Sequence, residues 1–447
     1  MFTQLIKLLS FINAMRDMEV SEQNNMYVHG EGELMVPAHL NFSKFVLDRL
    51  RKGNLDGARL RYCITGEELN VRELTQRAVS TAAALMRLGV ARCEVVMVAG
   101  ELCTAYLPTV LAVVFTGAAC TSIDLECGSA ILLHKFNLTK PKYVICTRLF
   151  WERYGDILTG LDYIKTFICF DGLDNMESVE DMVKCHVDVD AFQPVDVSGN
   201  DVGLIMYSSG TTGMSKGVLL THQNLLARFE LTGYVYPDVK LMNIYASSEL
   251  NIITKTVIVF DESNAENICV GVVAPGVTVK VVNVETREAL GPEQRGEICV
   301  RSPALMKGYL GAPLPVDEQG FYPTGDLGYY DIKKRFYLVD RLTDVICYIG
   351  YMVSPGDIES VLLQHPAVSE AAVVGKPVGG EVVELPVGFV VLKPGAVATV
   401  DELQEYVDQR VSRYMQLRGG VRILHELPRN PRRKILRKRL RDILALE

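Results

Sequence analysis

The strongest chemical signal in the sequence is a loop rich in glycine and hydroxyl residues, YSSGTTGMSKG, at Tyr207–Gly217. Its glycines allow a tight turn whose backbone N–H groups face an anion, and its hydroxyls add further donors. Lys216 adds a positive charge. The spacing from Gly210 to Lys216 excludes a Walker A loop. A flexible linker is the alternative, but linkers seldom follow a buried strand directly. The pattern therefore predicts a polyphosphate-binding loop.

A second candidate is the basic segment LPRNPRRKILRKRLR, Leu427–Arg441. Taken alone, it is also compatible with a nuclear-import signal or a phosphate-binding patch. Pro428 and Pro431 favour a fixed loop that presents one lysine, Lys434. The chain as a whole carries a formal charge of −8, which argues against a nucleic-acid partner.

Three single residues have a structural alternative to a chemical role. Asp326 follows Gly325 in a TGD turn that an aspartate would also cap. Arg341 could form a surface ion pair, and we interpret His222 as a hydrogen-bonding residue at a helix start rather than a base. Nothing in the sequence resembles a Ser/His/Asp triad.

The elements that position these residues are predicted from hydrophobic periodicity. The run Val71–Gly89 has helical spacing and a glycine stop. Short runs rich in β-branched residues predict strands buried on both faces, as in a parallel sheet with helices on each side. These runs are CEVVMVAG, Tyr143–Thr147, Thr166–Phe170 and Val202–Gly210. The pieces TVKVVN, EICVRS and RFYLVDR, from about Thr278 on, are typical of antiparallel strands. After Asp340, a helix begins at Pro355, two strands follow, and a helix is expected from Asp401 to about Tyr414.

Composition sets limits on the compartment and the class of protein. With 447 residues, 49% of them apolar and 22% charged, the chain is expected to be a soluble α/β protein of several domains. Eleven cysteines without a CxxC pair favour reduced thiols and a cytoplasmic location over disulfides or a zinc site. The uncharged stretch 102–123 is interpreted as a buried helix and strand, not a transmembrane segment. A peroxisomal location is the alternative, although Ala445–Glu447 is not a tripeptide of the SKL kind.

The glycine-rich loop resembles the signature of the adenylate-forming enzymes, which comprise acyl- and aryl-CoA synthetases, adenylation domains and beetle luciferases. Three further motifs agree in order: YPTGDLGYYD at Tyr322–Asp331, VDRLTDVICYIGYMVSPGDIE at Val339–Glu359, and the basic segment Leu427–Arg441. The likeness runs from about Pro37 to the end and is strongest to 4-coumarate–CoA ligase-like and luciferase-like members. It implies an N-terminal extension (1–36), a large AMP-binding domain of parallel α/β subdomains with a β-rich piece (37–339), and a small mobile α+β domain (340–447).

The resemblance implies a role for each motif residue. The ATP phosphates would be bound by Ser208, Ser209, Gly210, Thr211, Thr212, Gly213 and Lys216. The segment NIYASSELN resembles a degraded adenine and magnesium motif, in which Tyr245 stacks on adenine, Ser248 replaces a threonine and Glu249 meets Mg²⁺. The remaining roles fall on Asp326 and Arg341 for ribose, Asp340 as the hinge, Gly350 on the coenzyme A side and Lys434 as the catalytic lysine.

The chain also departs from the family pattern. Only 32 positions separate Gly213 from Tyr245, where relatives place on the order of a hundred residues more, so we expect an internal gap between about Phe229 and Tyr236. Cys347 and Ile349 replace a lysine pair that serves the second half-reaction. Arg433 stands where glycine precedes the catalytic lysine.

The implied reaction joins a small-molecule carboxylic acid to coenzyme A, with ATP and Mg²⁺. The carboxylate attacks the α-phosphate to give an acyl-adenylate and pyrophosphate, and the thiol then takes the acyl group. The alternative is a catalytically impaired or inactive truncated relative, either a nucleotide-binding protein or the product of a splice form or gene model. The missing segment would line the pocket that binds the acid.

Overall fold

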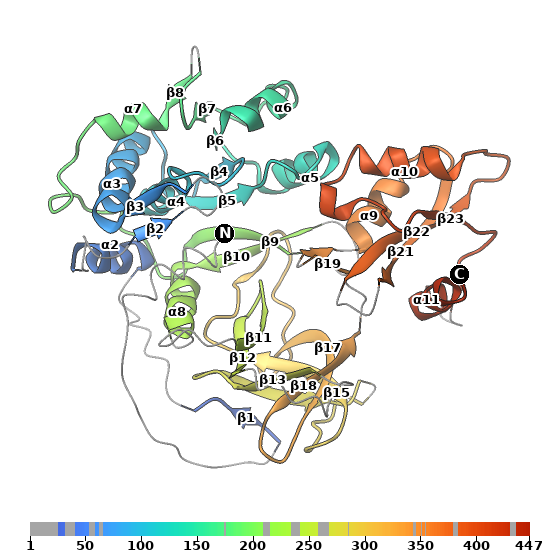
Figure 1. Ribbon diagram of the computed structural model, residues 1–447. Coiled ribbons are helices and arrows are strands. Elements are labelled where there is room, and N and C mark those ends of the chain that lie inside the picture. The colour runs from blue at the N-terminus through green and yellow to red at the C-terminus, as the bar shows by residue number, and fades with distance from the viewer. Residues whose placement is uncertain are drawn as a thin grey trace. The chain divides into compact units, whose positions relative to one another are not determined.

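The computed structural model, drawn as a ribbon in Figure 1, describes two groups of segments. Each group contains hydrophobic clusters of its own. The described residues are 26–31, 41–52, 59–61, 66–173, 176–208, 215–233, 242–257, 268–284, 286–342, 346–349, 351–353, 355–378, 383–429 and 435–447. The first unit consists of Met1–Ile123, Thr139–Met206 and Val218–Asp340. The second consists of Asp124–Leu138, Tyr207–Gly217 and Arg341–Glu447.

The first unit contains the predicted parallel sheet. Its strand order is β16-β10-β9-β5-β4-β6-β7-β8. The pairs from β9 through β5, β4, β6 and β7 to β8 are all parallel, and β10 pairs with β16 antiparallel. The strands are β4 (Val95–Ala99), β5 (Ala119–Ile123), β6 (Tyr143–Cys146), β7 (Thr166–Cys169), β8 (Glu177–Ser178), β9 (Val202–Ser208), β10 (Lys216–Thr221) and β16 (Gly308–Tyr309). Four of them coincide with the apolar runs from which strands were predicted.

Helices connect these strands, and the clearest one has a strong start signal. Asn70 and Glu73 form a reciprocal capping box at the start of α3, and Gly89 follows its end with φ +88°. Helix α4 is almost wholly buried, contacts β4 and β5, and packs on α3 (Figure 1). The helices are α2 (Phe42–Lys52), α3 (Val71–Arg87), α4 (Tyr106–Phe115), α5 (Ser129–Thr139), α6 (Arg148–Leu158), α7 (Val179–Lys184) and α8 (His222–Gly233), and a hairpin joins β2 (Arg59–Arg61) to β3 (Glu68–Asn70). The uncharged stretch is thus a buried helix and strand, as predicted, and no helix in the described ranges is long and apolar enough to cross a membrane.

A second, antiparallel sheet completes the first unit. Its strand order is β1-β14-β15-β17-β18-β13-β12-β11. The strands are β1 (Val28–His29), β11 (Met242–Ser247), β12 (Asn251–Val257), β13 (Ile268–Val273), β14 (Thr278–Val282), β15 (Gly296–Arg301), β17 (Tyr322–Tyr330) and β18 (Phe336–Arg341). β1 lies inside the expected N-terminal extension and pairs with β14, so these two residues add to the sheet edge. The segment after the expected gap supplies the opposite edge, β11.

The second unit is built on a three-stranded sheet. β21 (Val368–Pro377) pairs antiparallel with β22 (Glu384–Leu392), which pairs parallel with β23 (Val421–Ile423). Its other elements are the hairpin β19 (Ile346–Tyr348) and β20 (Tyr351–Val353), and the helices α9 (Pro355–Leu362), α10 (Val400–Asp408), η1 (Arg413–Met415) and α11 (Arg437–Ala445). Helix α5, which connects β5 to β6 along the chain, also belongs to this unit as far as Leu138. Ile131, from a segment far earlier in the chain, belongs to the same core as Leu403 and Val407.

The helix expected from Asp401 to about Tyr414 is shorter than predicted. Helix α10 ends at Asp408, and a separate 3₁₀ turn covers Arg413–Met415. The Asp408 carboxylate accepts a hydrogen bond from the backbone N–H of Leu417 at 3.0 Å. This bond folds the following chain back onto the helix end, a tertiary contact that helical periodicity does not predict.

Candidate functional site

The glycine-rich loop connects two neighbouring strands of the parallel sheet. Ser208 is the last residue of β9 and is buried, whereas Lys216 begins β10 and is exposed. Residues 209–214, which include the expected phosphate-binding residues Ser209, Gly210, Thr211, Thr212 and Gly213, lie outside the described residues.

The structure brings Tyr245 and Asp326 together. Tyr245 lies on the edge strand β11, and its hydroxyl donates to Oδ2 of Asp326 at 2.7 Å. Both side chains are buried, with residue exposures of 8% and 7%. Ser248 and Glu249 follow in the turn that leads to β12. Residues expected at the adenine, the ribose and the metal therefore come from two strands of one sheet and the turn after β11.

Asp326 lies in a bulge of the antiparallel sheet. In the pairing of β15 with β17, Glu297 is opposite Leu327 and Cys299 is opposite Pro323. The three residues of the TGD turn thus face the single residue Ile298, and Gly325 has φ +74°.

Hydrogen bonds from its own threonine stabilise this bulge. The Thr324 hydroxyl donates to the carbonyl of Ile298 at 2.8 Å and accepts from the N–H of Asp326 at 3.1 Å. These bonds replace part of the ladder that the bulge interrupts. The turn is therefore held by side chains and not by regular strand pairing.

Glu249 is oriented by a tyrosine that the sequence did not single out. The Tyr309 hydroxyl donates to Oε1 of Glu249 at 3.0 Å and is 2.8 Å from the Tyr322 hydroxyl. Burial raises the pKa of Tyr309 far above its ordinary value, so this hydroxyl keeps its proton. Tyr309 comes from β16 of the parallel sheet, and nothing in the local pattern KGYLG indicates that it reaches Glu249.

The described residues contain no group of three or more His, Cys, Asp or Glu side chains that could hold a metal ion. Glu249 alone still fits Mg²⁺, because this ion is commonly bound through one or two carboxylates together with substrate phosphates. A carboxylate is a type of ligand that suits Mg²⁺, and Oε1 of Glu249 is oriented by the Tyr309 hydroxyl.

Arg228 fixes the backbone of the Ser248–Glu249 turn. This arginine of α8 is 2% exposed, and its guanidinium donates to the carbonyls of Ser248 at 2.8 Å, Glu249 at 3.0 Å and Ala304 at 3.2 Å. Burial lowers its pKa to about 9, and the nearby Glu249 charge opposes that shift. Sequence reasoning missed Arg228, because an arginine in an amphipathic helix is ordinarily exposed.

The expectation for the His222 side chain was wrong. It is fully buried at the start of α8, and neither ring nitrogen has a hydrogen-bond partner in the described part of the chain. Its backbone N–H donates to the carbonyl of Asp201 at 3.0 Å. Burial lowers the pKa of His222 to about 4, so the ring is neutral and serves as a packing group.

The hinge residue Asp340 ends the first unit, and Arg341 begins the last segment of the second. Asp340 and Arg341 are the last residues of β18, and their side chains are not among the described ones. Gly350 and Lys434 lie outside the described residues altogether.

The second unit holds one buried carboxylate beside the end of the glycine-rich loop. The Ser215 hydroxyl donates to Oδ2 of Asp357 at 3.2 Å, and the Ser215 carbonyl is 2.8 Å from Nε2 of His134. Asp357 is 6% exposed, and its Oδ1 has no partner in the described residues. Burial raises its pKa to about 6, against the opposing effect of the Ser215 hydroxyl and of Lys135 and His134.

The raised pKa of Asp357 predicts a pH effect on stability. Its folded-state pKa lies above its ordinary value of 3.8, so folding favours the protonated form and stability falls as pH rises from about 4 to about 6. Asp357→Asn should remove this dependence and raise the free energy of unfolding at pH 7.5 by up to about 3 kcal/mol. Urea unfolding of both proteins at several pH values between 4 and 8 checks this. An asparagine variant that is less stable at pH 7.5 would contradict it.

Comparison with known proteins relates both parts of the chain to one family. The model of the AMP-binding enzymes matches residues 55–238 and 231–310, and the model of the AMP-binding enzyme C-terminal domain matches 357–434. The chain is 28% identical to luciferin 4-monooxygenase of Nipponoluciola cruciata over 497 aligned residues, covering 85% of this chain and 90% of the relative. It is 38% identical to 4-coumarate–CoA ligase 1 of Oryza sativa subsp. japonica over 178 residues, covering 39% and 31%. The structure of a long-chain-fatty-acid–CoA ligase from Archaeoglobus fulgidus aligns with a TM-score of 0.66 at 20% identity, covering 90% of this chain and 100% of that one.

Proposed function

The chain belongs to the AMP-binding enzyme family of adenylate-forming acyl- and aryl-CoA ligases, and from this premise we propose that it is an active ATP-dependent carboxylic acid:CoA ligase. The reaction runs through an acyl-adenylate. A carboxylate attacks the α-phosphate of ATP, pyrophosphate leaves, and the thiol of coenzyme A then displaces AMP from the acyl group.

The observation that carries this proposal is the contact between Tyr245 and Asp326. A buried carboxylate whose one oxygen is already oriented by a phenol is suited to accept hydrogen bonds from ribose hydroxyls. The Tyr245 ring then lies next to the ribose position, where an adenine would follow. Glu249, held by Tyr309 and by the turn that Arg228 supports, would bind the Mg²⁺ that accompanies the phosphates.

The remaining roles rest on the family likeness. Ser208–Gly213 and Lys216 would bind the phosphates, Ser248 would add a hydroxyl at the nucleotide, and Arg341 would assist at the ribose. Lys434 would stabilise the charge that develops at the α-phosphate. Between the two half-reactions, the small C-terminal domain would rotate about Asp340. The surface of that domain that bears Lys434 would then be replaced at the nucleotide by the surface that carries Gly350 and receives coenzyme A.

An internal gap near 229–236 is part of the proposal. In support, the family match breaks into two pieces that overlap at 231–238. The alignment to the luciferin 4-monooxygenase also spans 497 positions, although 85% of a 447-residue chain takes part, so a long stretch of the relative has no counterpart here.

The segment would have lined the acyl pocket, and we propose that its loss makes the enzyme slower with carboxylic acids than relatives of full length. Matches to both domains of the family nevertheless favour a ligase over an inactive relative.

Pyrophosphate exchange tests the proposed function. The purified chain, given Mg·ATP, labelled pyrophosphate and a panel of fatty and cinnamic acids, is expected to return label to ATP only when an acid that fits is present. Thioester formation should be the weaker half-reaction, because Cys347 and Ile349 supply no positive charge. Mg·ATP binding without exchange for any acid would identify the inactive relative instead.

A further inference from the structure

The bulge that carries Asp326 leaves a backbone donor to be satisfied from outside the ladder. Three residues of β17 lie opposite the single residue Ile298, so the N–H of Gly325 has no backbone carbonyl opposite it in the regular ladder of β15. A side chain fills that role: Oε1 of Glu297 accepts the hydrogen bond from the Gly325 N–H at 3.1 Å. Glu297 belongs to β15, directly before Ile298.

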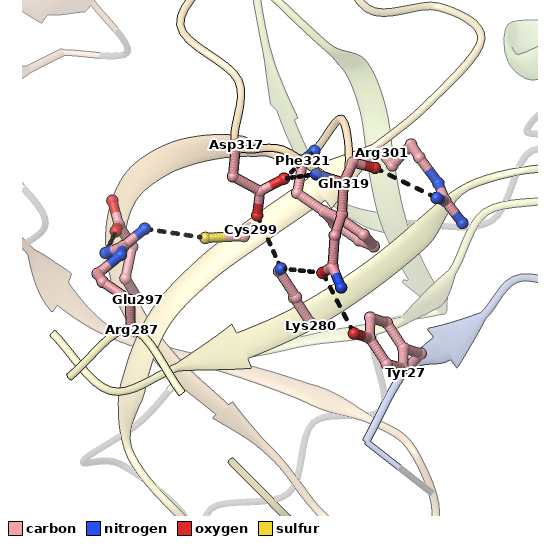
Figure 2. Close-up of polar contacts among 9 residues, drawn as sticks. All are labelled: Tyr27, Lys280, Arg287, Glu297, Cys299, Arg301, Asp317, Gln319 and Phe321. Carbon is pink, nitrogen blue, oxygen red and sulfur yellow. Dashed lines mark hydrogen bonds and ion pairs between the residues drawn. The ribbon is translucent and has the colours of Figure 1, made fainter. Parts of the chain in front are cut away.

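The second oxygen of Glu297 is also occupied. Nη1 of Arg287 donates to Oε2 of Glu297, and Nη2 of Arg287 lies 3.7 Å from the sulfur of Cys299 (Figure 2). Glu297 is 6% exposed, whereas the Arg287 side chain is about half exposed. A buried carboxylate is thus held between a cation on one side and the nucleotide-side turn on the other, so its orientation is fixed by two donors.

We propose that Glu297, oriented by Arg287, is a positioning residue that sets the Gly325–Asp326 turn so that the Asp326 carboxylate meets the ribose hydroxyls of ATP. This inference rests on the proposed function, because it assumes that Asp326 binds ribose. Glu297 itself does not contact the nucleotide in this arrangement; it acts through the amide that precedes Asp326.

The chemistry of the turn explains why one carboxylate matters. Gly325 has φ +74°, a conformation in which the peptide N–H points toward β15 and needs an acceptor there. Without the carboxylate that N–H is unpaired, and the turn relaxes toward a geometry that pairs it with water or with another carbonyl. Asp326 would move with it, and only interactions made through Asp326 would weaken.

The same sheet offers a matched control in Lys280. Lys280 lies on β14 opposite Cys299, is 6% exposed like Glu297, and donates to Oδ2 of Asp317 at 2.7 Å and to Oε1 of Gln319 at 2.8 Å (Figure 2). Those acceptors lie in the loop before β17 and not in the TGD turn. Lys280→Met therefore breaks an ion pair of a side chain that is as buried as Glu297, but it removes no contact of the TGD turn.

Nucleotide analogues provide the test. Affinities for Mg·ATP and Mg·2′,3′-dideoxy-ATP are measured by calorimetry for the wild-type chain, Glu297→Ala and Lys280→Met. The wild type should bind Mg·ATP about 10-fold or more tightly than the dideoxy analogue, because only ATP has the two ribose hydroxyls that donate to the Asp326 carboxylate. Glu297→Ala should reduce this preference to about twofold or less, mainly by lowering the affinity for Mg·ATP and not by raising the affinity for the dideoxy analogue. Lys280→Met should keep the wild-type ratio even if its melting temperature falls.

Two further variants separate positioning from folding. Glu297→Gln keeps an oxygen that accepts the Gly325 N–H, and it is expected to retain most of the ATP preference. Arg287→Met keeps the carboxylate but removes the donor that orients it, so a several-fold fall in the ratio is expected even if Glu297→Ala does not fold.

The outcomes distinguish this inference from the proposed function. A wild-type chain that binds the two nucleotides equally, or binds neither, would overturn the ribose role of Asp326 and the inference with it. A wild-type chain that prefers ATP, together with folded Glu297→Ala or Arg287→Met variants that prefer it equally, would overturn the positioning role alone.

Discussion

Replacing Lys434 with alanine is expected to slow acyl-adenylate formation about 10²–10³-fold while leaving Mg·ATP affinity nearly unchanged. The ammonium group is proposed to act on charge that develops at the α-phosphate only in the transition state. Its removal therefore costs little in the ground-state complex. Single-turnover formation of the adenylate, with ATP affinity measured separately, checks both halves of the expectation.

Lys438 provides the control for the Lys434 experiment. It lies in the same basic segment, four residues further on, so Lys438→Ala changes the net charge equally and should leave adenylate formation within about twofold of the wild type. A loss confined to ATP binding in Lys434→Ala would contradict the proposed role. Altered, salt-dependent retention on DNA with unchanged adenylation would instead favour a nucleic-acid site in this segment.

Arg228→Met should lower the free energy of unfolding by about 3 kcal/mol and weaken the response to Mg²⁺. The substitution removes a guanidinium that bonds three carbonyls, and those of Ser248 and Ala304 are left without that donor inside the protein. Part of the cost is offset, because burying the charged guanidinium is itself unfavourable. Urea unfolding measures the first effect, and the Mg²⁺ dependence of pyrophosphate exchange measures the second.

Arg51 is the matched control for Arg228. Its guanidinium also bonds backbone carbonyls, those of Val189 and Phe192 at 2.5 Å each, in a different part of the first unit. Arg51→Met should lower stability without changing the Mg²⁺ dependence. If both variants shifted the Mg²⁺ dependence equally, the effect would be general and the link from Arg228 to Glu249 would be wrong.

Much of the fold follows from short-range patterns in the sequence. The strands β4, β6, β7 and β9 were predicted because parallel strands covered on both faces form continuous β-branched runs. Helix α3 was predicted from its hydrophobic periodicity, and a capping box marks its start in the structure. Helix α10 was predicted too long, because the contact that ends it joins Asp408 to a residue outside the helical pattern. Local pattern thus predicts the elements better than their ends.

The candidate site was predictable only where a motif is continuous in the chain. Tyr245, Glu249 and Asp326 were identified by resemblance to family motifs, and the structure brings Tyr245 and Asp326 into contact. Arg228 and Tyr309 could not be found this way, because they reach Glu249 from a helix and a strand that tertiary packing alone brings close. Glu297 lies in the run EICV, which predicts only a strand. Its proposed role depends on a bulge in β17, the strand opposite, which the local sequence does not indicate. The roles of Lys434 and of the phosphate-binding residues stay predictions.

The composition of the second unit has a consequence for how the protein is made. Residues 124–138 belong to this unit, and Ile131 shares its core with residues of α10. On the ribosome, this segment emerges about 200 residues before Arg341–Glu447, the largest part of its unit, a delay of roughly 10–40 s at ordinary translation rates. During that time its apolar side chains lack their final partners, while the first unit's strands on either side are already available to pair. The nascent chain should therefore depend on a chaperone that holds this segment until residues 341–447 have been synthesised.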